Sequence, residues 1–404
     1  MAETILVLNA GSSSIKFQLF GVRPDARLER RVKGQMDGIG SRPRLLAKDG
    51  DGHVLIDRTF ATPEVSNVSV ALDKVIAFLR ETIGTLPTAI GHRVVHGGPN
   101  YAEPTIVNPA VLNQLERLTP LAPLHQPHNL GLIRLIAARQ PHLLQVACFD
   151  TAFHRGHADV ADRYAIPEAL YSEGVRRYGF HGLSYEYIAA HLAETLPEVA
   201  AGRVVVAHLG SGASMCAIAS GRSVESTMGF TALDGLPMGT RPGQLDAGVL
   251  LYLLSEKGME AKAIERLLYN DCGLKALSGI SNDVRVLLGS SEKRAKLALD
   301  YFVYRVALST GMLVAAMGGI DAFVFTAGIG ENAPSIRAAV LQRLACFGLA
   351  IDEAANGRGG PLISPPGAGV PCYVIPTDEE LMIARHTLRV RQQQAAPQLK
   401  EKRA

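Results

Sequence analysis

The chain contains the same short pattern twice, about half its length apart. When Gly11 is laid over Gly210, the segment ILVLNAGSSS falls on VVVAHLGSGA. Each segment is an apolar run that ends in a polar residue, one apolar residue and then a glycine with small residues, which is typical of a buried strand entering a tight turn. A repeat of this kind predicts two similar domains. Because buried strands that end in glycine turns are common, a chance match is the alternative.

The order of the remaining segments indicates the architecture. Residues 5–60 read as strands, including a hairpin whose turn is DGDG. Apolar residues at helical spacing from Val68 to Ile83, behind the candidate caps Ser66 and Asn67, predict an amphipathic helix. Helices and strands then alternate, which predicts mixed sheets flanked by helices. At 404 residues the chain also exceeds a typical single core, which favours two domains.

The composition argues against several classes of partner. The formal net charge is +3, and no block rich in lysine or arginine precedes the last few residues, so we expect neither nucleic acid nor membrane as a partner. The five cysteines contain no C-x-x-C pair, which suits a reducing cytoplasm, and the N-terminus shows no secretory signal pattern. The apolar stretch 306–329 is interrupted by Asp321 and by glycines, which favours a buried helix followed by a buried strand over a membrane span.

Three glycine-containing segments are candidate phosphate sites. The first turn offers backbone N–H groups and serine hydroxyls, with Ser12 in the turn and Lys16 after it, and such donor-rich turns suit phosphate oxygens. The second copy, HLGSGAS, would hold the same polyphosphate from its other side. The segment FVFTAGIGEN runs from an apolar strand into a glycine turn, where Gly328 and Gly330 permit close approach of a ligand. For each segment considered alone, an ordinary polar turn is the alternative.

Four side chains elsewhere are candidates for catalysis or for binding an anionic substrate. Arg93 in GHRVVHGG and Arg241 in MGTRPG lie among apolar or small residues, and a guanidinium group matches carboxylate and phosphate oxygens. A structural salt bridge is the alternative for either arginine. Asp150 ends an apolar strand, and His181 follows an aromatic residue, where a buried structural histidine is the alternative reading.

The segment PTDEELMIA separates two adjacent glutamates. Thr377, followed three residues later by Glu380, predicts a capping box before a helix, which gives Glu380 a structural role. Glu379 then remains available to reach a magnesium ion directly or through water. The histidine pairs at 125/128 and 154/157 do not form the H-E-x-x-H pattern, so we do not expect a zinc site.

Taken in order, these motifs resemble those of the acetate kinase family. The segments that carry the resemblance, from about residue 5 to 386, are NAGSSSIKF, GHRVVHGG, FDTAFH, RYGFHGLS, HLGSGAS, MGFTALDGLPMGTRPG, SGISNDVR, FTAGIGEN and IPTDEELMIA. The resemblance implies an α/β fold of duplicated actin-like (ribonuclease H-like) domains, mixed sheets flanked by helices, a cleft between the two domains and usually a homodimer. It also implies an N-terminal domain of residues 1–150 plus 377–404, with a returning C-terminal helix, and a nucleotide-binding domain of residues 151–376.

The resemblance further implies roles for individual residues. The catalytic residues would be Arg93, Asp150, His181 and Arg241, with Arg93 on the acyl carboxylate. Asn9 and Glu379 would lie near Mg²⁺ or Mn²⁺. The nucleotide would contact Ser12, Lys16, His208, Leu209, Gly210, Ser211, Gly212, Asp283, Val284, Arg285, Gly328, Ile329, Gly330, Glu331 and Asn332. The acyl group would contact Arg93, Val95, Leu124, Phe180 and Ala232, and His125 is a further candidate without an assigned role.

The residues also qualify the resemblance. Acetate is already ionised at neutral pH, since carboxyl groups titrate near pKa ~4, so no general base is needed and we predict that Asp150 orients a metal-bound water or an arginine.

Four positions depart from the family pattern. Ser211 stands where the family often has Asn, Val284 where it has an aromatic residue, Gln244 where it has an acidic residue and Ala232 where it has Pro. Without the proline ring beside the acyl pocket, one more methylene would fit, which makes propionate a second candidate substrate.

The resemblance therefore predicts a cytoplasmic, Mg²⁺-dependent acetate kinase that interconverts ATP and acetate with ADP and acetyl phosphate by direct in-line transfer. Two alternatives stay open. One is a propionate or broader short-chain acyl kinase of the same family. The other is a nucleotide-binding protein of the actin-like fold without acyl transfer. The physiological direction, the preferred nucleotide, the use of pyrophosphate and the dimer surface also stay open.

Overall fold

The computed structural model describes residues 3–84 and 86–401. The chain forms two compact units: the first consists of Met1–Ala152 and Asp378–Ala404, and the second of Phe153–Thr377. The boundaries expected from the sequence, after residues 150 and 376, lie within two residues of these divisions. The chain thus leaves the first unit once and returns to it with its last helix.

The first unit is built on an eight-stranded sheet in the order β5-β4-β3-β2-β1-β6-β8-β7. β1 pairs antiparallel with β2 and parallel with β6, and β6 pairs parallel with β8. The strands are β1 (Thr4–Ala10), β2 (Ile15–Val22), β3 (Leu28–Asp37), β4 (Arg44–Asp49), β5 (Val54–Thr59), β6 (Ala89–Val94), β7 (Thr105–Ile106) and β8 (Leu144–Phe149).

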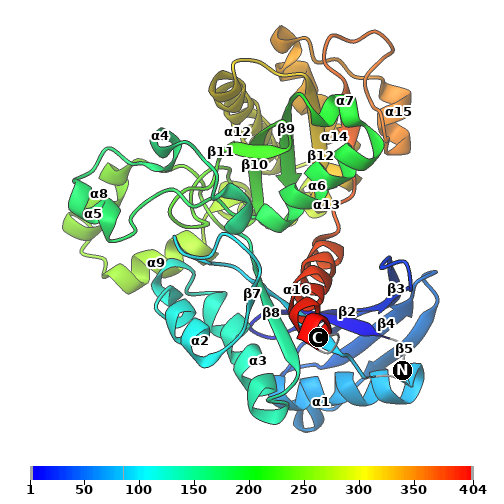
Figure 1. The fold of residues 1–404 in the computed structure, drawn as a ribbon. Helices are drawn as coiled ribbons and strands as arrows, with labels where there is room; N and C mark the ends of the chain where they lie inside the picture. Colours follow the sequence, from blue (N-terminus) through cyan, green and yellow to red (C-terminus); the bar gives the residue numbers. More distant parts are fainter. Residues whose placement is uncertain (1–2, 85, 402–404) are drawn as a thin grey trace. The chain divides into compact units, whose positions relative to one another are not determined.

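Two helices cover one face of this sheet, α1 (Val68–Phe78) and α3 (Gln126–Arg139) (Figure 1). Their apolar side chains and those of β1 and β2 form one buried cluster, which removes apolar surface from water and stabilises the unit. α1 begins where the sequence predicts it, because Asn67 Oδ1 accepts a hydrogen bond from the Val70 N–H at 3.1 Å and so caps the helix.

α16 (Glu379–Glu401) packs against β1 and β6 on the other face of the first sheet (Figure 1). Gly91 on β6 permits this close approach, because a Cβ atom there would lie 2.6 Å from the side chain of Ile383 and 2.4 Å from Thr387 Oγ1. β6 and α16 each carry a candidate site residue, Arg93 near the end of the strand and Glu379 at the start of the helix.

The second unit is built on a five-stranded sheet in the order β11-β10-β9-β12-β13. β9 pairs antiparallel with β10 and parallel with β12, and β12 pairs parallel with β13. These directions repeat those of β3-β2-β1-β6-β8, so the predicted duplication is confirmed. The strands are β9 (Arg203–Leu209), β10 (Ala213–Ala219), β11 (Arg222–Ser226), β12 (Ala322–Thr326) and β13 (Cys372–Val374).

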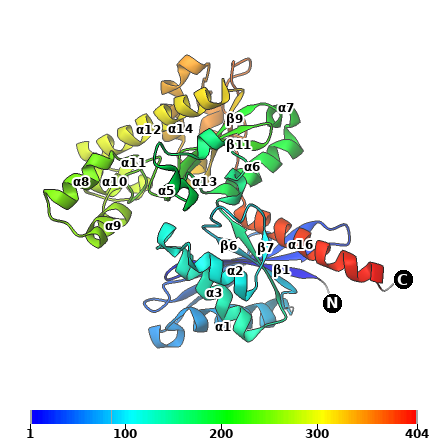
Figure 2. The same ribbon diagram turned by 60° about the vertical axis from the view of Figure 1, so that its left-hand side comes forward.

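Helices also flank the second sheet (Figure 2). α6 (Gly182–Thr195) buries Tyr185, Ile188 and Leu192 against β9, β10 and β12, and the long α12 (Lys293–Met317) contacts β9, β10 and β11. The remaining α-helices are α2 (Pro109–Glu116), α4 (Asp159–Asp162), α5 (Glu168–Ser172), α7 (Pro197–Ala200), α8 (Ala247–Ser255), α9 (Ala261–Asn270), α10 (Gly273–Ser278), α11 (Val284–Leu288), α13 (Ala327–Asn332), α14 (Pro334–Arg343) and α15 (Glu353–Arg358). Shorter helical turns cover Thr62–Val65, Leu79–Ile83, Thr119–Leu121, Ala152–His154 and Ala345–Phe347.

The apolar stretch 306–329 is divided between a helix and a strand, as the sequence predicts. α12 ends at Met317, where Gly318 adopts the left-handed conformation with φ 70°, and the chain resumes as β12 at Ala322. Within the part of the chain that the structure describes, α12 is one helix with the length and hydropathy to cross a membrane. One of its faces is buried in the second unit, so these properties are also those of a core helix.

Candidate active site

The first hairpin places two candidate residues side by side. Asn9 on β1 lies opposite Lys16 on β2, and the Gly11 N–H closes the turn between them by donating to the Ser14 carbonyl at 2.9 Å. Ser12 is exposed at the tip of this turn. Lys16 lines a hollow of about 370 Å³ together with Lys33, Lys48, Gln18 and Glu380. The excess of ammonium groups around this hollow suits an anionic ligand.

A charged pair lies at the carboxyl ends of β6 and β8. Arg93 Nη2 donates to Asp150 Oδ2 at 2.6 Å, and Arg93 Nε donates to Asp150 Oδ1 at 3.0 Å, so the contact is bidentate. The Asp150 side chain is 2% exposed and that of Arg93 is 20% exposed. Burial alone would lower the pKa of Arg93, but the negative charges of Asp150 and Glu379 outweigh burial and raise it. Arg93 therefore remains a guanidinium ion.

α16 brings a third carboxylate to this pair. Glu379 Oε2 lies 3.8 Å from Arg93 Nε. The capping box predicted from Thr377 and Glu380 is wrong: Asp378 caps the helix by accepting from the Leu381 N–H at 2.9 Å, and Thr377 Oγ1 has no hydrogen-bond partner among the described residues. The reason is that the helix begins later than the box requires, at Glu379. Glu380 instead lies half-buried beside the hollow that Lys16 lines, where desolvation and then the charge of Glu379 raise its pKa.

His208 on the second hairpin stacks on His181, the residue that precedes α6. The rings of His181 and His208 lie 4.2 Å apart with an interplanar angle of 16°. Each ring is oriented by a serine, because His181 Nδ1 lies 2.8 Å from Ser214 Oγ and His208 Nδ1 lies 2.8 Å from Ser184 Oγ. Gly212 in the hairpin turn leaves room for the ring of His181, since a Cβ atom at position 212 would lie 3.2 Å from His181 Nε2.

His181 also has an uncommon backbone conformation. Its φ is 57°, in the left-handed region, and α6 begins at the next residue. A non-glycine residue in this region costs of order 1 kcal/mol and such residues gather at functional sites. The backbone therefore aims this imidazole at some energetic cost, which supports a role beyond packing.

Arg241 is fastened to the second hairpin through its own loop. Arg241 Nη1 donates to the Ala232 carbonyl at 3.1 Å, and the Gly239 N–H donates to the Ser211 carbonyl at 3.3 Å. Gly273 holds this loop close, because it has φ 64° and a Cβ atom there would lie 2.1 Å from the Met238 carbonyl oxygen. The loop of Arg241 and the turn of Ser211 are thus parts of one local structure.

The segment AGIGEN is helical. The sequence analysis treats it as a turn, but the structure shows the short helix α13 directly after β12, entered through Ala327 at φ 64°. A Cβ atom at Gly328 would meet nothing within 4 Å, so the backbone here is open to a ligand. Arg337, which is 1% exposed, donates from Nη1 to the carbonyls of Gly330 and Glu331 at 2.9 Å and fixes the end of this helix.

The family model described as the acetokinase family matches residues 4–385. The chain belongs to the acetokinase family. It is 60% identical over 386 residues to the acetate kinase of Nitrobacter hamburgensis, an alignment that covers 96% of each chain. It is 55% identical to the acetate kinase of Rhizobium meliloti, over 96% of this chain and 98% of that one.

Solved structures of acetokinase-family proteins have the same fold. The propionate kinase of Francisella tularensis is 35% identical with a TM-score of 0.88, over 96% of this chain and 99% of that one. The acetate kinase of Porphyromonas gingivalis is 35% identical with a TM-score of 0.85, over 96% of this chain and 100% of that one. The predicted fold, duplicated actin-like domains with mixed sheets flanked by helices, agrees with these likenesses.

The structure groups some of the candidate residues and separates others within each unit. Arg93, Asp150 and Glu379 come together in the first unit, where Val95 is buried and Leu124 is 41% exposed beside His125 at the start of α3. In the second unit, Asp283 caps α11 and pairs with Arg285 at 2.6 Å, so both charges are neutralised locally. Val284 is buried, and so is Phe180.

Several residues that hold the candidate site in place are not predicted from the sequence. Gln126 and Asn129 on α3 are buried and bind the backbone of His96, Val95 and Ala10 at the ends of β6 and β1. Ser184, Ser214 and Arg337 orient the second unit's groups in the same way. A polar residue inside an apolar helical pattern is the available signal, but the sequence does not say which backbone group it binds.

Proposed function

We propose that the protein is an acetate kinase, which reversibly transfers the γ-phosphoryl group of ATP to acetate to give acetyl phosphate and ADP. The observation that carries the proposal is the bidentate Arg93–Asp150 pair beside Glu379, in a chain of the acetokinase family. A guanidinium group already held in a fixed plane needs little reorganisation to bind a second carboxylate. Phosphoryl transfer depends mainly on such positioning and on neutralisation of charge.

Within this proposal Arg93 binds the carboxylate of acetate, and Asp150 orients Arg93. Acetate enters as an anion, so the reaction has no proton for Asp150 to remove. The distances support this division of roles, since Asp150 uses both oxygens on Arg93. Val95, Leu124, Phe180 and Ala232 are proposed to contact the methyl group.

A divalent cation fits the first unit's donors. The amide oxygen of Asn9 and the carboxylate of Glu379 are hard oxygen ligands of the kind that Mg²⁺ and Mn²⁺ prefer. Desolvation and then the negative charge of Glu379 raise the pKa of Glu380, and a cation at the start of α16 would offset the second of these causes. When bound, the metal ion would neutralise charge on the phosphates during transfer.

The nucleotide is proposed to bind through the second unit and the first hairpin. The turn from His208 to Gly212 and the open face of α13 at Gly328 offer backbone N–H groups to phosphates, and Lys16 and Ser12 add donors from the first hairpin. Residues 283–285 and 329–332 are proposed contacts as well. His181 and Arg241 would stabilise the charge on the transferring phosphoryl group.

Propionate is the competing substrate. A solved relative of 35% identity is a propionate kinase, and Ala232 lacks the ring that the family pattern places there. One methylene changes discrimination by only ~1–3 kcal/mol. We expect kcat/KM to favour acetate in the native enzyme, and Ala232→Pro to widen the preference. A native kcat/KM that is higher for propionate would make the protein a propionate kinase instead.

We also propose that the enzyme is a cytoplasmic homodimer. No disulfide joins the five cysteines in the part of the chain that the structure describes, as expected in a reducing compartment. α12 presents apolar side chains at spacings of three and four residues, each at least 36% exposed: Leu297, Tyr301, Tyr304, Leu308 and Met312. The same stripe on a second copy would cover it symmetrically. Leu308→Asp should shift the sedimentation coefficient from dimer to monomer, whereas Val54→Asp should not.

Trapping of the product with hydroxylamine tests the activity. With ATP, Mg²⁺ and acetate, the enzyme should form acetyl hydroxamate, and omission of acetate or Mg²⁺ should abolish the signal. ATP binding without acyl phosphate under any of these conditions would contradict the proposal. It would favour the alternative of a nucleotide-binding protein without acyl transfer.

A further inference from the structure

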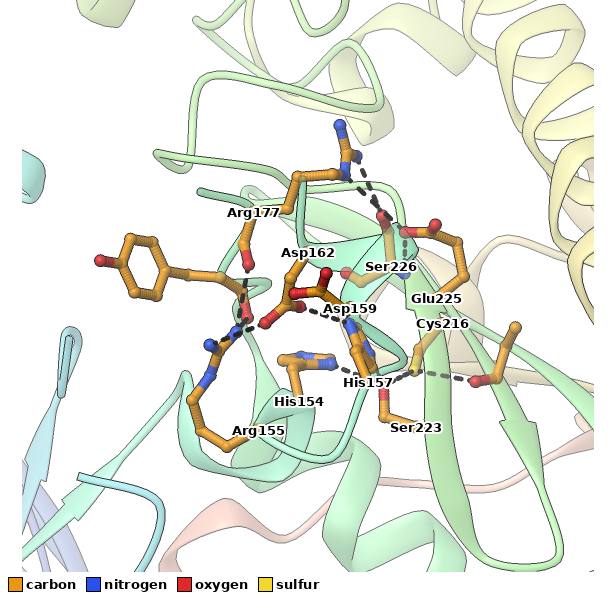
Figure 3. Close-up of polar contacts among 12 residues, drawn as sticks. His154, Arg155, His157, Asp159, Asp162, Arg177, Cys216, Ser223, Glu225 and Ser226 are labelled. Atoms are coloured by element: carbon orange, nitrogen blue, oxygen red, sulfur yellow. Dashed lines mark hydrogen bonds and ion pairs between the residues drawn. The ribbon is translucent and has the colours of Figure 1, made fainter. Parts of the chain in front are cut away.

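A chain of buried polar side chains in the second unit has no part in the proposed reaction (Figure 3). Ser223 Oγ on β11 lies 2.8 Å from His154 Nδ1 and 2.7 Å from His157 Nε2. His157 Nδ1 faces Asp162 Oδ1 on α4 at 3.4 Å. All four side chains are at most 12% exposed. Such a network must satisfy its own donors and acceptors, because water does not reach it freely.

One end of this chain holds the backbone that leads to His181. His154 Nε2 lies 3.0 Å from the carbonyl oxygen of Phe180, the residue before His181. Gly179 has φ 73° and packs on the same ring, since a Cβ atom there would lie 2.6 Å from His154 Cδ2. The left-handed turn at His181 is therefore built directly on the imidazole of His154.

Arg155 ties the other end of the chain to the same turn. Its Nη2 donates to the carbonyls of Arg177 and Tyr178 at 3.1 and 3.0 Å, and its Nη1 donates to Asp162 Oδ2 at 3.2 Å. The Arg177 N–H donates to the Asp162 carbonyl at 2.8 Å. The residues that precede His181 are thus held by both ends of this hydrogen-bond network, by His154 at one end and by Arg155 and Asp162 at the other.

The direction of each hydrogen bond follows from the Phe180 end. A carbonyl oxygen only accepts, so His154 Nε2 carries a hydrogen. Burial, followed by the charge of His157, lowers the pKa of His154 to about 3, so its ring is neutral and Nδ1 accepts. Ser223 must then donate its single hydroxyl hydrogen to His154 and accept from His157 Nε2. The Cys216 thiol lies 3.2 Å from Ser223 Oγ and donates to the Ala217 carbonyl at 3.5 Å; burial raises its pKa to about 12, so it adds no charge there.

At the Asp162 end of the network, the same assignment leaves one hydrogen bond without a donor. If His157 were neutral with its hydrogen on Nε2, its Nδ1 lone pair would face the Asp162 carboxylate. Neither His157 Nδ1 nor Asp162 Oδ1 has a hydrogen-bond partner among the described residues, although the two atoms lie 3.4 Å apart and both are buried. Two facing acceptors without a donor are costly in a low dielectric. One proton between them closes the chain.

That proton belongs on His157. Asp162 Oδ2 accepts from the Arg155 guanidinium, which favours the ionised carboxylate. The neutral His154 ring lies 5.5 Å from His157 between centroids, and the Cys216 thiol contacts Ser223, the residue that both rings share. Glu225 lies beyond Ser223 on β11 and faces Arg177 at 3.8 Å.

We propose that the chain Asp162–His157–Ser223–His154 is a positioning device for His181 that is complete only while His157 carries hydrogens on both ring nitrogens. Loss of one proton leaves Ser223 with a single hydrogen for two ring nitrogens, because a neutral His157 that keeps its bond to Asp162 must turn a lone pair to Ser223. The bond to His154 then weakens, and with it the anchor of the Phe180 carbonyl. Alkaline pH should therefore loosen the turn of His181.

Nitrogen-15 NMR of the histidine-labelled native enzyme tests the hydrogen assignment without any mutation. At pH 7 both nitrogens of His157 should have protonated shifts, and His154 should be the neutral tautomer with hydrogen on Nε2. Raising the pH should move the signals of both rings with one midpoint. An unprotonated His157 Nδ1 at pH 7 would overturn the proposal.

Kinetics test the positioning role, which rests on the proposed kinase activity. Asp162→Asn offers an amide N–H to a neutral His157 and an oxygen to Arg155, so it should close the chain at every pH. We expect kcat within twofold of native and no alkaline decline at the NMR midpoint. Asp162→Ala and Ser223→Ala should lower kcat about tenfold, which corresponds to ~1.4 kcal/mol, with KM values within twofold.

Asp159→Asn is the matched control, since it changes a carboxylate of the same helix that pairs outside the chain with Arg163. It should keep the native kcat and the native alkaline decline. Equal losses in Asp162→Asn and Asp162→Ala would overturn the proposal, as would an unchanged pH profile in Asp162→Asn. If the native protein makes no acyl phosphate, the proposed function fails, but the NMR titration still decides the state of the chain.

Discussion

The two hairpins of the duplicated fold share a backbone path and differ in chemistry. In the first unit Asn9 lies opposite Lys16, and ions gather near it as Arg93, Asp150 and Glu379. In the second unit His208 lies opposite Ser214, and the neighbours are a second imidazole and serine hydroxyls. The duplication fixed where side chains meet the end of each sheet, and the residues placed there set a different electrostatic character.

The partners differ for a physical reason. A carboxylate that is 2% exposed must have a counter-ion, so removal of Arg93 would leave the charge of Asp150 buried and unpaired. Two imidazoles stacked at 4.2 Å cannot both be charged cheaply, so hydroxyl groups orient them instead. The first unit is therefore suited to bind ions, and the second to stabilise charge that appears only during the reaction.

Removal of the ionic centre of the first unit should have the largest effect. Arg93→Ala leaves Asp150 buried without its counter-ion and removes the proposed ligand of acetate. We expect kcat/KM for acetate to fall by roughly 10²–10³-fold, or about 3–4 kcal/mol, measured with the hydroxamate assay. Arg93→Lys keeps the charge but not the fork and should recover only part of the loss. Native activity in Arg93→Ala would show that the first unit does not bind acetate through this ion pair.

Removal of the imidazole of His181 should act on kcat alone. His181→Ala should lower kcat by roughly 10²-fold, or about 2.7 kcal/mol, because a group aimed at the transition state contributes little to ground-state binding. Isothermal titration with ATP should show an unchanged Kd. A matched loss of ATP affinity would instead make His181 a binding residue, and the contrast between the units would disappear.

A buried histidine makes the first unit sensitive to acid. Burial lowers the pKa of His92 to about 4, opposed by its hydrogen bond to Gln145 at 2.8 Å. Its folded pKa lies below the unfolded value of about 6.5, so its contribution to stability is complete above pH ~6.5 and is lost as the pH falls toward 4. His92→Gln should reduce the fall in apparent Tm between pH 7 and pH 5 by about 2–4 °C. The exposed His53→Gln should leave that fall unchanged, and an equal response of both variants would contradict the assignment.

The smallest effect should come from the second turn. Ser211 is exposed, and its side chain is short where the family pattern often has Asn. Ser211→Asn should add one hydrogen bond to phosphate and lower KM for ATP by about two- to twelvefold, since such a bond contributes about 0.5–1.5 kcal/mol. Ser13→Asn in the first turn, which has one more residue than the second, is the comparison. Equal responses of the two turns would show that their difference has no consequence for ATP.

The sequence predicted the large elements well and their ends less well. The repeat at Gly11 and Gly210 predicted two sheets built alike, because alternation of apolar residues and a glycine turn are local signals. The cap of α16 was misassigned, since Thr377 and Asp378 are both good capping residues and the exact start of the helix decides between them. AGIGEN was read as a turn because glycines weaken helix propensity, but Arg337 from α14 binds the end of that helix.

The sequence by itself determined the duplicated hairpins, the family and the residue types at the candidate site. Those follow from patterns of a few neighbouring residues. Tertiary structure alone decided that Asp150 faces Arg93, that His181 stacks on His208, and that Ser223 joins His154 to His157 across 66 to 69 positions. The partner of a buried polar group depends on which strands and helices pack together, and that information is spread over the whole core rather than held near either residue.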